Sequence, residues 1–170
     1  MTGTVRVVAW RSEWPELFAR ERARLATVFD GPGERIEHVG STSVAGLAAK
    51  PIIDIMVGVK ALDDVEARIG ALEALGYQYV PQYESEIPER RYFRRPHRRP
   101  RTHHVHCVVL GGRLWTRHLA FRDHLRAHPD DAEAYGRLKR RLARRSAQDR
   151  RAYLEGKDPF IRRILEEVVS

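Results

Sequence analysis

The sequence predicts an α+β fold, close to the α/β class, in which helices pack on a β-sheet and the C-terminal half is helical. Two patterns support this prediction. Short apolar runs separated by turn residues fill the middle of the chain, which is typical of strands, whereas apolar residues from Trp115 onward recur at helical spacing. With 170 residues, 42% of them hydrophobic, we expect one domain over residues 1–170.

The N-terminal two thirds predict one helix, a series of strands and a second helix. Ser12 can cap a helix running to about Asp30, which Gly31-Pro32-Gly33 then breaks. Asp63 can begin another helix, which Gly76 closes with a left-handed cap. Five runs are expected as strands: Ile36–Val39, Ile52–Val57, Tyr77–Val80, Arg91–Arg95 and His104–Leu110.

The C-terminal part predicts several helices. Asp130 and Glu133 have the spacing of a capping box, which indicates a helix start. Asp158-Pro159 is expected to open the last helix, because proline is tolerated in the first turn of a helix. The buried stripe of that helix is expected to be Phe160, Ile161, Ile164, Leu165 and Val168.

Charge and cysteine usage narrow the environment and the partners. The formal net charge of +8 suits an anionic partner, although a general preference for arginine explains much of the excess equally well. The lone Cys107 excludes an internal disulfide bond and is expected to be a buried, inert thiol. Neither a signal peptide nor a membrane span is recognisable, so we expect a cytoplasmic protein without a membrane partner.

The segment 36–55 is the most informative part of the sequence. It reads as a strand, a turn of small polar residues at Gly40, Ser41, Thr42 and Ser43, and then a second strand that carries Asp54. Backbone N–H groups in such a turn can form a concave anion site, and Gly40 lets the backbone approach a ligand closely. A phosphate site facing an acid on a strand predicts a nucleotide and a metal ion.

This segment resembles the hallmark of the GrpB family, a His-x-Gly-Ser-Thr-Ser-Val-x-Gly-Leu-x-x-Lys-Pro-x-x-Asp run. The resemblance implies a nucleotidyltransferase-like fold with a mixed sheet, a superfamily whose signature places Asp-x-Asp or Asp-x-Glu after the Gly-Ser turn. Here Met56 occupies the second acidic position. The likeness continues at Gly76-Tyr77, Arg91–Phe93, His103–His106, Phe121–Arg126, Tyr135–Lys139 and Lys157–Ile161.

Asp54 is the candidate catalytic residue, as a metal ligand or a general base. It lies in an apolar run, where a carboxylate without a partner is costly. The alternative is a structural ion pair, for example with Lys50, which we otherwise expect to bind phosphate. Two-metal transfer chemistry needs several carboxylates, so the resemblance in fold does not by itself establish a transferase.

The histidines offer replacements for the missing acid. His104 and His106 alternate onto one face of their strand, and His38 precedes the Gly-Ser turn. We expect His106 and His38 to join Asp54 in binding a divalent metal ion, with His106 in the same cavity as Asp54 and a preference for metals that accept nitrogen ligands. The alternative is one hydrogen-bonded core histidine and one surface histidine. The other histidines are expected on the surface: His97, His103, His118, His124 and His128.

Several basic residues are candidates for binding phosphates. The family resemblance favours Arg91 in the nucleotide cleft and implies the same role for Arg122, Lys139 and Lys157, each of which could equally be a surface cation. The dense Arg90–Arg101 run is interleaved with aromatic residues, a pattern that also suits single-stranded nucleic acid.

The sequence therefore leaves three functions open. The first is a protein that binds a nucleotide or another phosphorylated small molecule and transfers a nucleotidyl or phosphoryl group, with a metal ion, to an acceptor. The second is a non-catalytic accessory domain, because the family domain is also found fused to a kinase of coenzyme A biosynthesis. The third is a nucleic-acid-binding protein that uses the Arg90–Arg101 run.

Overall fold

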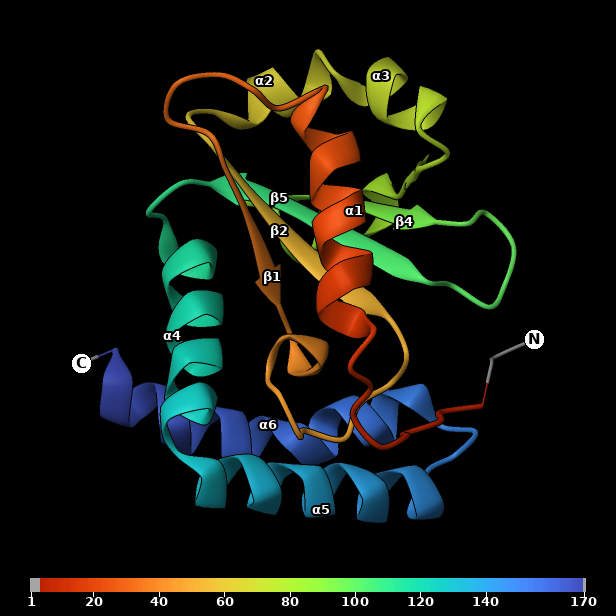
Figure 1. The fold of residues 1–170 in the computed structure, drawn as a ribbon, viewed down its shortest axis with the longest axis vertical. Coiled ribbons are helices and arrows are strands. Elements are labelled where there is room, and N and C mark those ends of the chain that lie inside the picture. Colours follow the sequence, from red (N-terminus) through yellow and green to blue (C-terminus); the bar gives the residue numbers. More distant parts are fainter. Residues whose placement is uncertain (1–3, 170) are drawn as a thin grey trace.

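The computed structural model describes residues 4–169 and forms a mixed five-stranded sheet with helices on both faces (Figure 1). The strands are β1 (Arg35–Val39), β2 (Ile53–Val59), β3 (Gln78–Tyr79), β4 (Arg90–Arg95) and β5 (His103–Val109). The α-helices are α1 (Trp14–Ala26), α2 (Leu62–Glu66), α3 (Ile69–Ala74), α4 (Arg113–Ala127), α5 (Pro129–Arg145) and α6 (Arg150–Val168). Two short 3₁₀ helices are η1 (Ser41–Ser43) and η2 (Pro81–Tyr83).

The strand order is β1-β2-β5-β4-β3, and only β2 and β5 run parallel among the described strands. The register places Asp54 opposite His104 and Met56 opposite His106 in this parallel pair. The observed fold confirms the predicted α+β class, a sheet packed by helices, and the helical C-terminal part.

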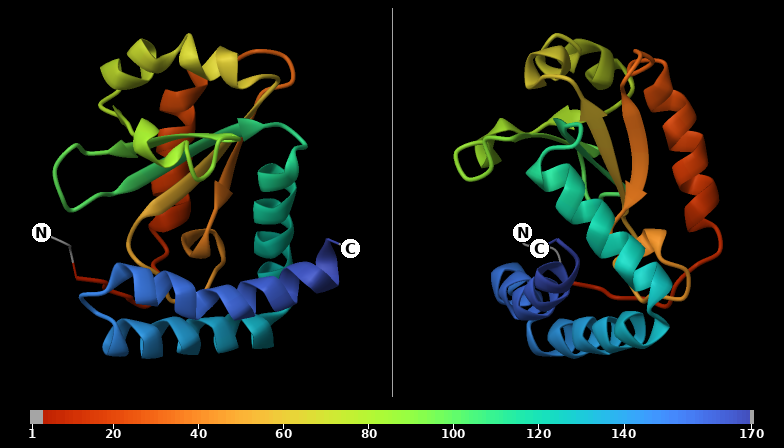
Figure 2. Two further views of the ribbon diagram at one scale, coloured as in Figure 1. Left: turned by 180° about the vertical axis from the view of Figure 1, so that it is seen from behind. Right: turned by 90° about the vertical axis from the view of Figure 1, so that its left-hand side faces the viewer.

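One face of the sheet carries the main hydrophobic core. Its side chains from β2 and β5 include Ile55, Val57 and Val105, each fully buried. Helix α1 covers this face with Trp14 and Leu25, and Figure 2 shows α1 and α4 on opposite sides of the sheet. The burial of these apolar side chains is the main contribution to the stability of the fold.

The opposite face is covered by α4 and carries a smaller core. Val39, Met56 and Val108 pack there against partly buried residues of α4, which include Trp115. Helices α5 and α6 pack on α4 and on each other and lie beyond one end of the sheet (Figures 1 and 2). A third apolar cluster, which includes Leu125 and Tyr135, joins these helices to the loop after η1.

The last helix begins earlier than predicted. Helix α6 starts at Arg150, its N-cap Asp149 accepts a hydrogen bond from the backbone N–H of Ala152 (3.0 Å), and Pro159 lies inside the helix. The Asp158-Pro159 start was therefore wrong, since α6 contacts α5 on both sides of the proline: Gly156 lies close to Leu142, and Arg163 pairs with Asp131.

Two other helices also differ from the prediction. Helix α1 begins at Trp14, and its N-cap is Glu13 rather than Ser12. The single helix expected after Asp63 is two short helices, α2 and α3, and Gly76 has the expected positive φ of 90°. No helix among residues 4–169 is long and apolar enough to cross a membrane.

We predict that Gly58→Ala destabilises the fold, because Gly58 gives α4 room to approach the sheet. An added Cβ would lie 2.7 Å from Leu110 Cδ1 and 2.8 Å from Trp115 Cζ3. Overpacking of this kind costs ~1–3 kcal/mol of unfolding free energy. Urea denaturation measures this change. The matched control is Gly70→Ala in α3, where a Cβ would meet nothing within 4 Å and where alanine should stabilise by ~0.5–1 kcal/mol. Equal stability of the two variants would contradict this explanation.

Candidate functional site

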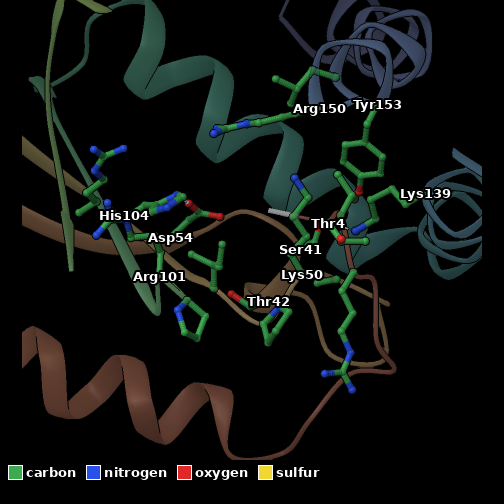
Figure 3. Close-up of a pocket in the computed structure, with 18 of the residues that line it drawn as sticks. Thr4, Ser41, Thr42, Lys50, Asp54, Arg101, His104, Lys139, Arg150 and Tyr153 are labelled. Carbon is green, nitrogen blue, oxygen red and sulfur yellow. Dashed lines mark hydrogen bonds and ion pairs between the residues drawn. The ribbon is translucent and has the colours of Figure 1, made fainter. Parts of the chain in front are cut away.

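A cavity of about 710 Å³ lies between the face of the sheet that carries Asp54, the η1 turn, and helices α5 and α6. Figure 3 shows Asp54 and His104 on the sheet side of this cavity, and Lys139, Arg150 and Tyr153 on the helices across it. The basic side chains that line it are Arg6, Lys50, Arg94, Arg99, Arg101, Lys139, Arg150 and Lys157. Among the described residues that line it, Asp54 supplies the carboxylate. Such an excess of positive charge favours a ligand with several negative charges.

Asp54 is held by two histidines. Its Oδ1 atom lies 3.4 Å from His104 Nδ1 and 3.4 Å from His106 Nε2. Burial alone would raise the pKa of Asp54, but hydrogen bonds from His104 and His106 outweigh it and hold this pKa below the ordinary value. The carboxylate is therefore charged at neutral pH. The alternative ion pair with Lys50 is not formed, since the Lys50 ammonium group lies over the Tyr153 ring, 4.4 Å from its centroid.

These three residues could hold a metal ion. One oxygen of Asp54 and one nitrogen each of His104 and His106 lie within 4.8 Å of one another. One carboxylate and two imidazoles form a donor set that suits zinc, manganese or nickel better than magnesium. The parallel pairing of β2 and β5 creates this cluster, because it brings Asp54 and His104 side by side on one face.

Gly40 makes room for Asp54. Its φ of +71° lies in the left-handed region, and an added Cβ would lie 2.7 Å from Asp54 Oδ2. The turn that follows presents Ser41 and Thr42 to the cavity. The expected juxtaposition of the turn and the acid is therefore observed.

Ser43 does not face the cavity. Its hydroxyl group donates to the Gly40 carbonyl oxygen (2.5 Å), and its own carbonyl oxygen accepts from Arg126 (2.8 Å). Ser43 therefore shapes the turn. This placement contradicts the prediction that Ser43 contacts phosphate in the cavity.

His38 lies on the opposite face of the sheet from Asp54, so its predicted role as a metal ligand is contradicted. It pairs with Ile55 in the sheet, stacks on Phe18 of α1 with ring centroids 4.7 Å apart, and contacts Thr42 Oγ1 through Nε2 (2.9 Å). Burial lowers the pKa of His38 to about 4, so this ring is neutral at physiological pH. Alternation along a strand explains the error, because adjacent residues point to opposite faces.

Arg91 lies on the face of the sheet opposite the cavity, which contradicts its predicted place in the nucleotide cleft. It forms an ion pair with Glu66 (2.8 Å) and lies near Glu84. Antiparallel pairing places Tyr92 and Arg94 beside His106 and His104 instead, and Arg94 lines the cavity. The sequence missed Arg94 because the register that decides the face is a tertiary feature.

Arg122 ties α4 to the sheet rather than entering the cavity. Its guanidinium group donates to Glu37 Oε2 (2.8 Å) and to the His38 carbonyl oxygen (3.0 Å). These partners occupy the group that was expected to bind phosphate.

The two histidines beside Asp54 differ in access. His104 lines the cavity, whereas His106 reaches Asp54 from beside Tyr92, on whose ring it stacks with centroids 5.3 Å apart. We expected His106 to point into the same cavity as Asp54. His106 does contact Asp54, but the histidine that lines the cavity is His104. Two histidines predicted on the surface, His103 and His124, are buried.

The three lysines of the cavity lie close to aromatic rings and to one another. Lys50 and Lys157 lie over the Tyr153 ring, and Lys139 lies over the Tyr135 ring. Burial, followed by the charge of Lys157, lowers the pKa of Lys50 to about 8, and burial lowers the pKa of Lys157 too. One face of α6 lines the cavity with Arg150, Tyr153 and Lys157. Their separation by three and four positions in the sequence is typical of one helix face, and it could have indicated a shared site.

Lys139 is the most enclosed of the three, with 2% of its surface exposed. Its amino group donates a hydrogen bond to Ser41 Oγ at 2.5 Å. Burial, followed by the charges of Lys157 and Lys50, lowers the pKa of Lys139 to about 6.

Comparison with known proteins identifies the family. A family model described as GrpB protein matches residues 4–167. The chain belongs to the GrpB family. A crystal structure of conserved protein GrpB from Enterococcus faecalis has the same fold, with a TM-score of 0.86, 37% identity, and coverage of 96% of this chain and 97% of that one.

Curated relatives include UPF0157 proteins of Pseudomonas aeruginosa and Bacillus subtilis, which are 46% and 40% identical to this chain over 92% and 93% of its length. The chain spans only 64% and 45% of the length of these two relatives. A protein named dephospho-CoA kinase from Mycolicibacterium paratuberculosis is 30% identical over 93% of this chain, which spans 44% of that protein.

We predict that Gly40→Ala destabilises the protein more than Gly46→Ala does. Both glycines have positive φ, so alanine brings backbone strain of ~1–3 kcal/mol at either position. Only at Gly40 would the new Cβ also collide with Asp54, and at Gly46 it would meet nothing within 4 Å. We therefore expect an additional loss of ~1–3 kcal/mol for Gly40→Ala in urea denaturation. Equal losses would show that the close approach to Asp54 carries no energetic weight.

We predict that Lys139→Met raises the melting temperature at about pH 6 more than at about pH 10. The pKa of Lys139 is 10.5 when unfolded and about 6 when folded, so the unfolded chain binds more protons between these values. The stability of the parent therefore rises with pH across this window, and the advantage of methionine shrinks. Thermal denaturation at both pH values measures the effect, with exposed Lys60→Met as control. An advantage that does not change with pH would contradict the buried, depressed lysine.

Proposed function

We propose that this chain binds a nucleoside triphosphate or a similar phosphorylated small molecule together with one divalent metal ion, and transfers a phosphoryl or nucleotidyl group from it to an acceptor. The observation that carries the proposal is the cavity itself, in which eight basic side chains surround the Asp54–His104–His106 cluster. A polyphosphate would neutralise this charge, and arginine and lysine are the side chains that most often bind phosphate.

The roles follow from position in the cavity. Asp54, His104 and His106 would hold the metal ion, which would polarise phosphoryl oxygens and so ease attack on phosphorus. Lys50, Lys157, Arg94 and Arg150 would bind phosphate oxygens from the two sides of the cavity. The turn at Gly40–Thr42, followed by an acid on the next strand, also supports the nucleotidyltransferase-like interpretation of the fold.

A second candidate is an accessory domain that binds such a ligand without turnover. It is favoured by the similarity to dephospho-CoA kinase, in which a region matching this chain makes up 44% of a longer protein. That relative is named as a kinase, and kinases transfer a phosphoryl group, which fits the anionic ligand proposed here. Binding without product would support the accessory role.

The arrangement of the Arg90–Arg101 run favours a small ligand over nucleic acid. Arg91 and Arg95 lie on the face of the sheet that carries Val105 and Cys107, where Arg95 pairs with the buried Glu21 (3.0 Å). Arg94, Arg99 and Arg101 line the cavity on the other face. The run is therefore divided between two surfaces and does not form one stripe.

We predict that Asp54→Asn and His104→Ala each weaken the binding of zinc or manganese at least about tenfold, because each removes one of three ligands. Isothermal titration of the full chain with the metal alone measures this loss. His38→Ala is the matched control, since His38 lies on the other face and should leave metal affinity unchanged.

The nucleotide is tested separately. ATP titrated with and without the metal should bind, and Lys50→Met and Lys157→Met should each weaken it at least about tenfold at low salt, since each removes one phosphate contact. A product assay with the same protein then separates transfer from binding alone. Absence of ATP binding under every metal condition would refute the proposed ligand class.

A further inference from the structure

The close contact between Ser41 and Lys139 is not explained by anion binding alone. Ser41 begins the η1 helix directly after Gly40, lines the cavity and is only partly buried. Lys139 reaches it from the middle of α5, and its Nζ lies 2.5 Å from Ser41 Oγ. Both side chains line the cavity, and within it the amino group of Lys139 lies against a hydroxyl group.

We propose that Ser41 is a nucleophile and that Lys139 is its general base, forming a serine–lysine pair that attacks phosphorus in the bound ligand. The proposal shares its cavity with the proposed function and rests on that function only for the class of substrate, a phosphoric anhydride. A weak hydroxyl nucleophile needs an adjacent base within hydrogen-bond reach, which is the arrangement observed here.

The surroundings of Lys139 favour the neutral amine that a base requires. It is 2% exposed, and the charged groups that act on it are Lys157 of α6, Lys50 before β2, Arg140 of α5 and Asp54 of β2. Three of these four are cations and oppose protonation, so burial and charge together lower the pKa of Lys139 to about 6. Lys50, Lys157 and the arginines remain to neutralise the phosphates.

The reaction balances as a double displacement. Ser41 Oγ attacks the terminal phosphorus, the Oγ–P bond forms, and the bond to the bridging oxygen breaks, so that the nucleoside diphosphate leaves with the electron pair. The hydroxyl proton of Ser41 passes to Lys139 Nζ. An acceptor hydroxyl group, of water or of an alcohol, then attacks the same phosphorus, and the Oγ–P bond breaks. Ser41 recovers its proton from Lys139, and the proton of the acceptor leaves to solvent.

A fluorophosphonate tests the pair without a nucleotide, because such a reagent reacts with an activated serine by forming an Oγ–P bond and releasing fluoride. The full chain is treated at a series of pH values, and the adduct is measured by intact mass and peptide mapping. We expect one adduct, at Ser41, with a rate that rises from about pH 5 to about pH 8 as Lys139 loses its proton. Ser85→Ala should react like the parent, because Ser85 is exposed and does not line the cavity.

Lys139→Met and Lys139→Arg should each slow labelling by roughly 100-fold, the usual contribution of a general base. Circular dichroism confirms folding, and if neither variant folds the pH profile of the parent decides. No adduct on Ser41 of the parent, a rate that does not change with pH, or labelling that is unaffected in a folded Lys139 variant would overturn the proposal.

ATP distinguishes this proposal from the proposed function. If ATP with metal slows labelling of Ser41, the nucleophile and the nucleotide share one cavity. If Ser41 is labelled through Lys139 but ATP neither binds nor protects, the serine–lysine pair stands and the nucleotide ligand is wrong. If ATP binds but Ser41 is not labelled, the nucleotide ligand stands and the serine–lysine pair is wrong.

Discussion

The parallel pairing of β2 with β5 is the constraint on which the rest of the structure depends. Both strands lie in the interior of the sheet, and their register places Asp54 beside His104 and Met56 beside His106. Because side chains alternate along a strand, a slip of one residue would turn Asp54 into the apolar core under α1 and expose Ile53 or Ile55 to the cavity. Apolar burial therefore fixes the register, and the register creates the histidine–carboxylate cluster.

The cavity concentrates positive charge. Several cations on α5, α6, β4 and the segments beside the sheet face one another across a shared space, and each raises the cost of protonating its neighbours. The aromatic rings of Tyr135 and Tyr153 offset part of that cost by contact with the three lysine ammonium groups. An anion that binds only the folded state would relieve the remaining repulsion and stabilise the protein.

Much of the fold was readable from the sequence, because strand and turn signals are local. The β1, β4 and β5 runs, the turn at Gly40 and the left-handed Gly76 all appear where apolar alternation and glycine chemistry place them. The start of α6 was not readable, since packing on α4 and α5 overrides the local signal of Asp158-Pro159.

The candidate site was partly readable for the same reason. Asp54 and Ser41 lie close together in the sequence, and they meet as expected. The predicted roles of Arg91 in phosphate binding and of His38 in metal binding were wrong. The face that a strand residue occupies depends on pairing with a distant strand, which the local sequence does not specify. The contact between Lys139 and Ser41 spans 98 positions and is a product of helix packing, which no local pattern encodes.

Position 56 shows why this chain departs from a site with two acids. Met56 lies on the same face as Asp54 but is fully buried, where it packs with Val39 and Val108 beneath Trp115 of α4. A carboxylate there would be removed from water beside Val39, Val108 and Trp115, and it would lie next to the acidic Glu37 of β1, at a high cost in desolvation and charge repulsion. Helix α4 thus covers the position at which a second acid would stand. The imidazoles of β5 approach Asp54 from the neighbouring strand instead, so the group that could hold a metal ion here has one carboxylate oxygen and two imidazole nitrogens.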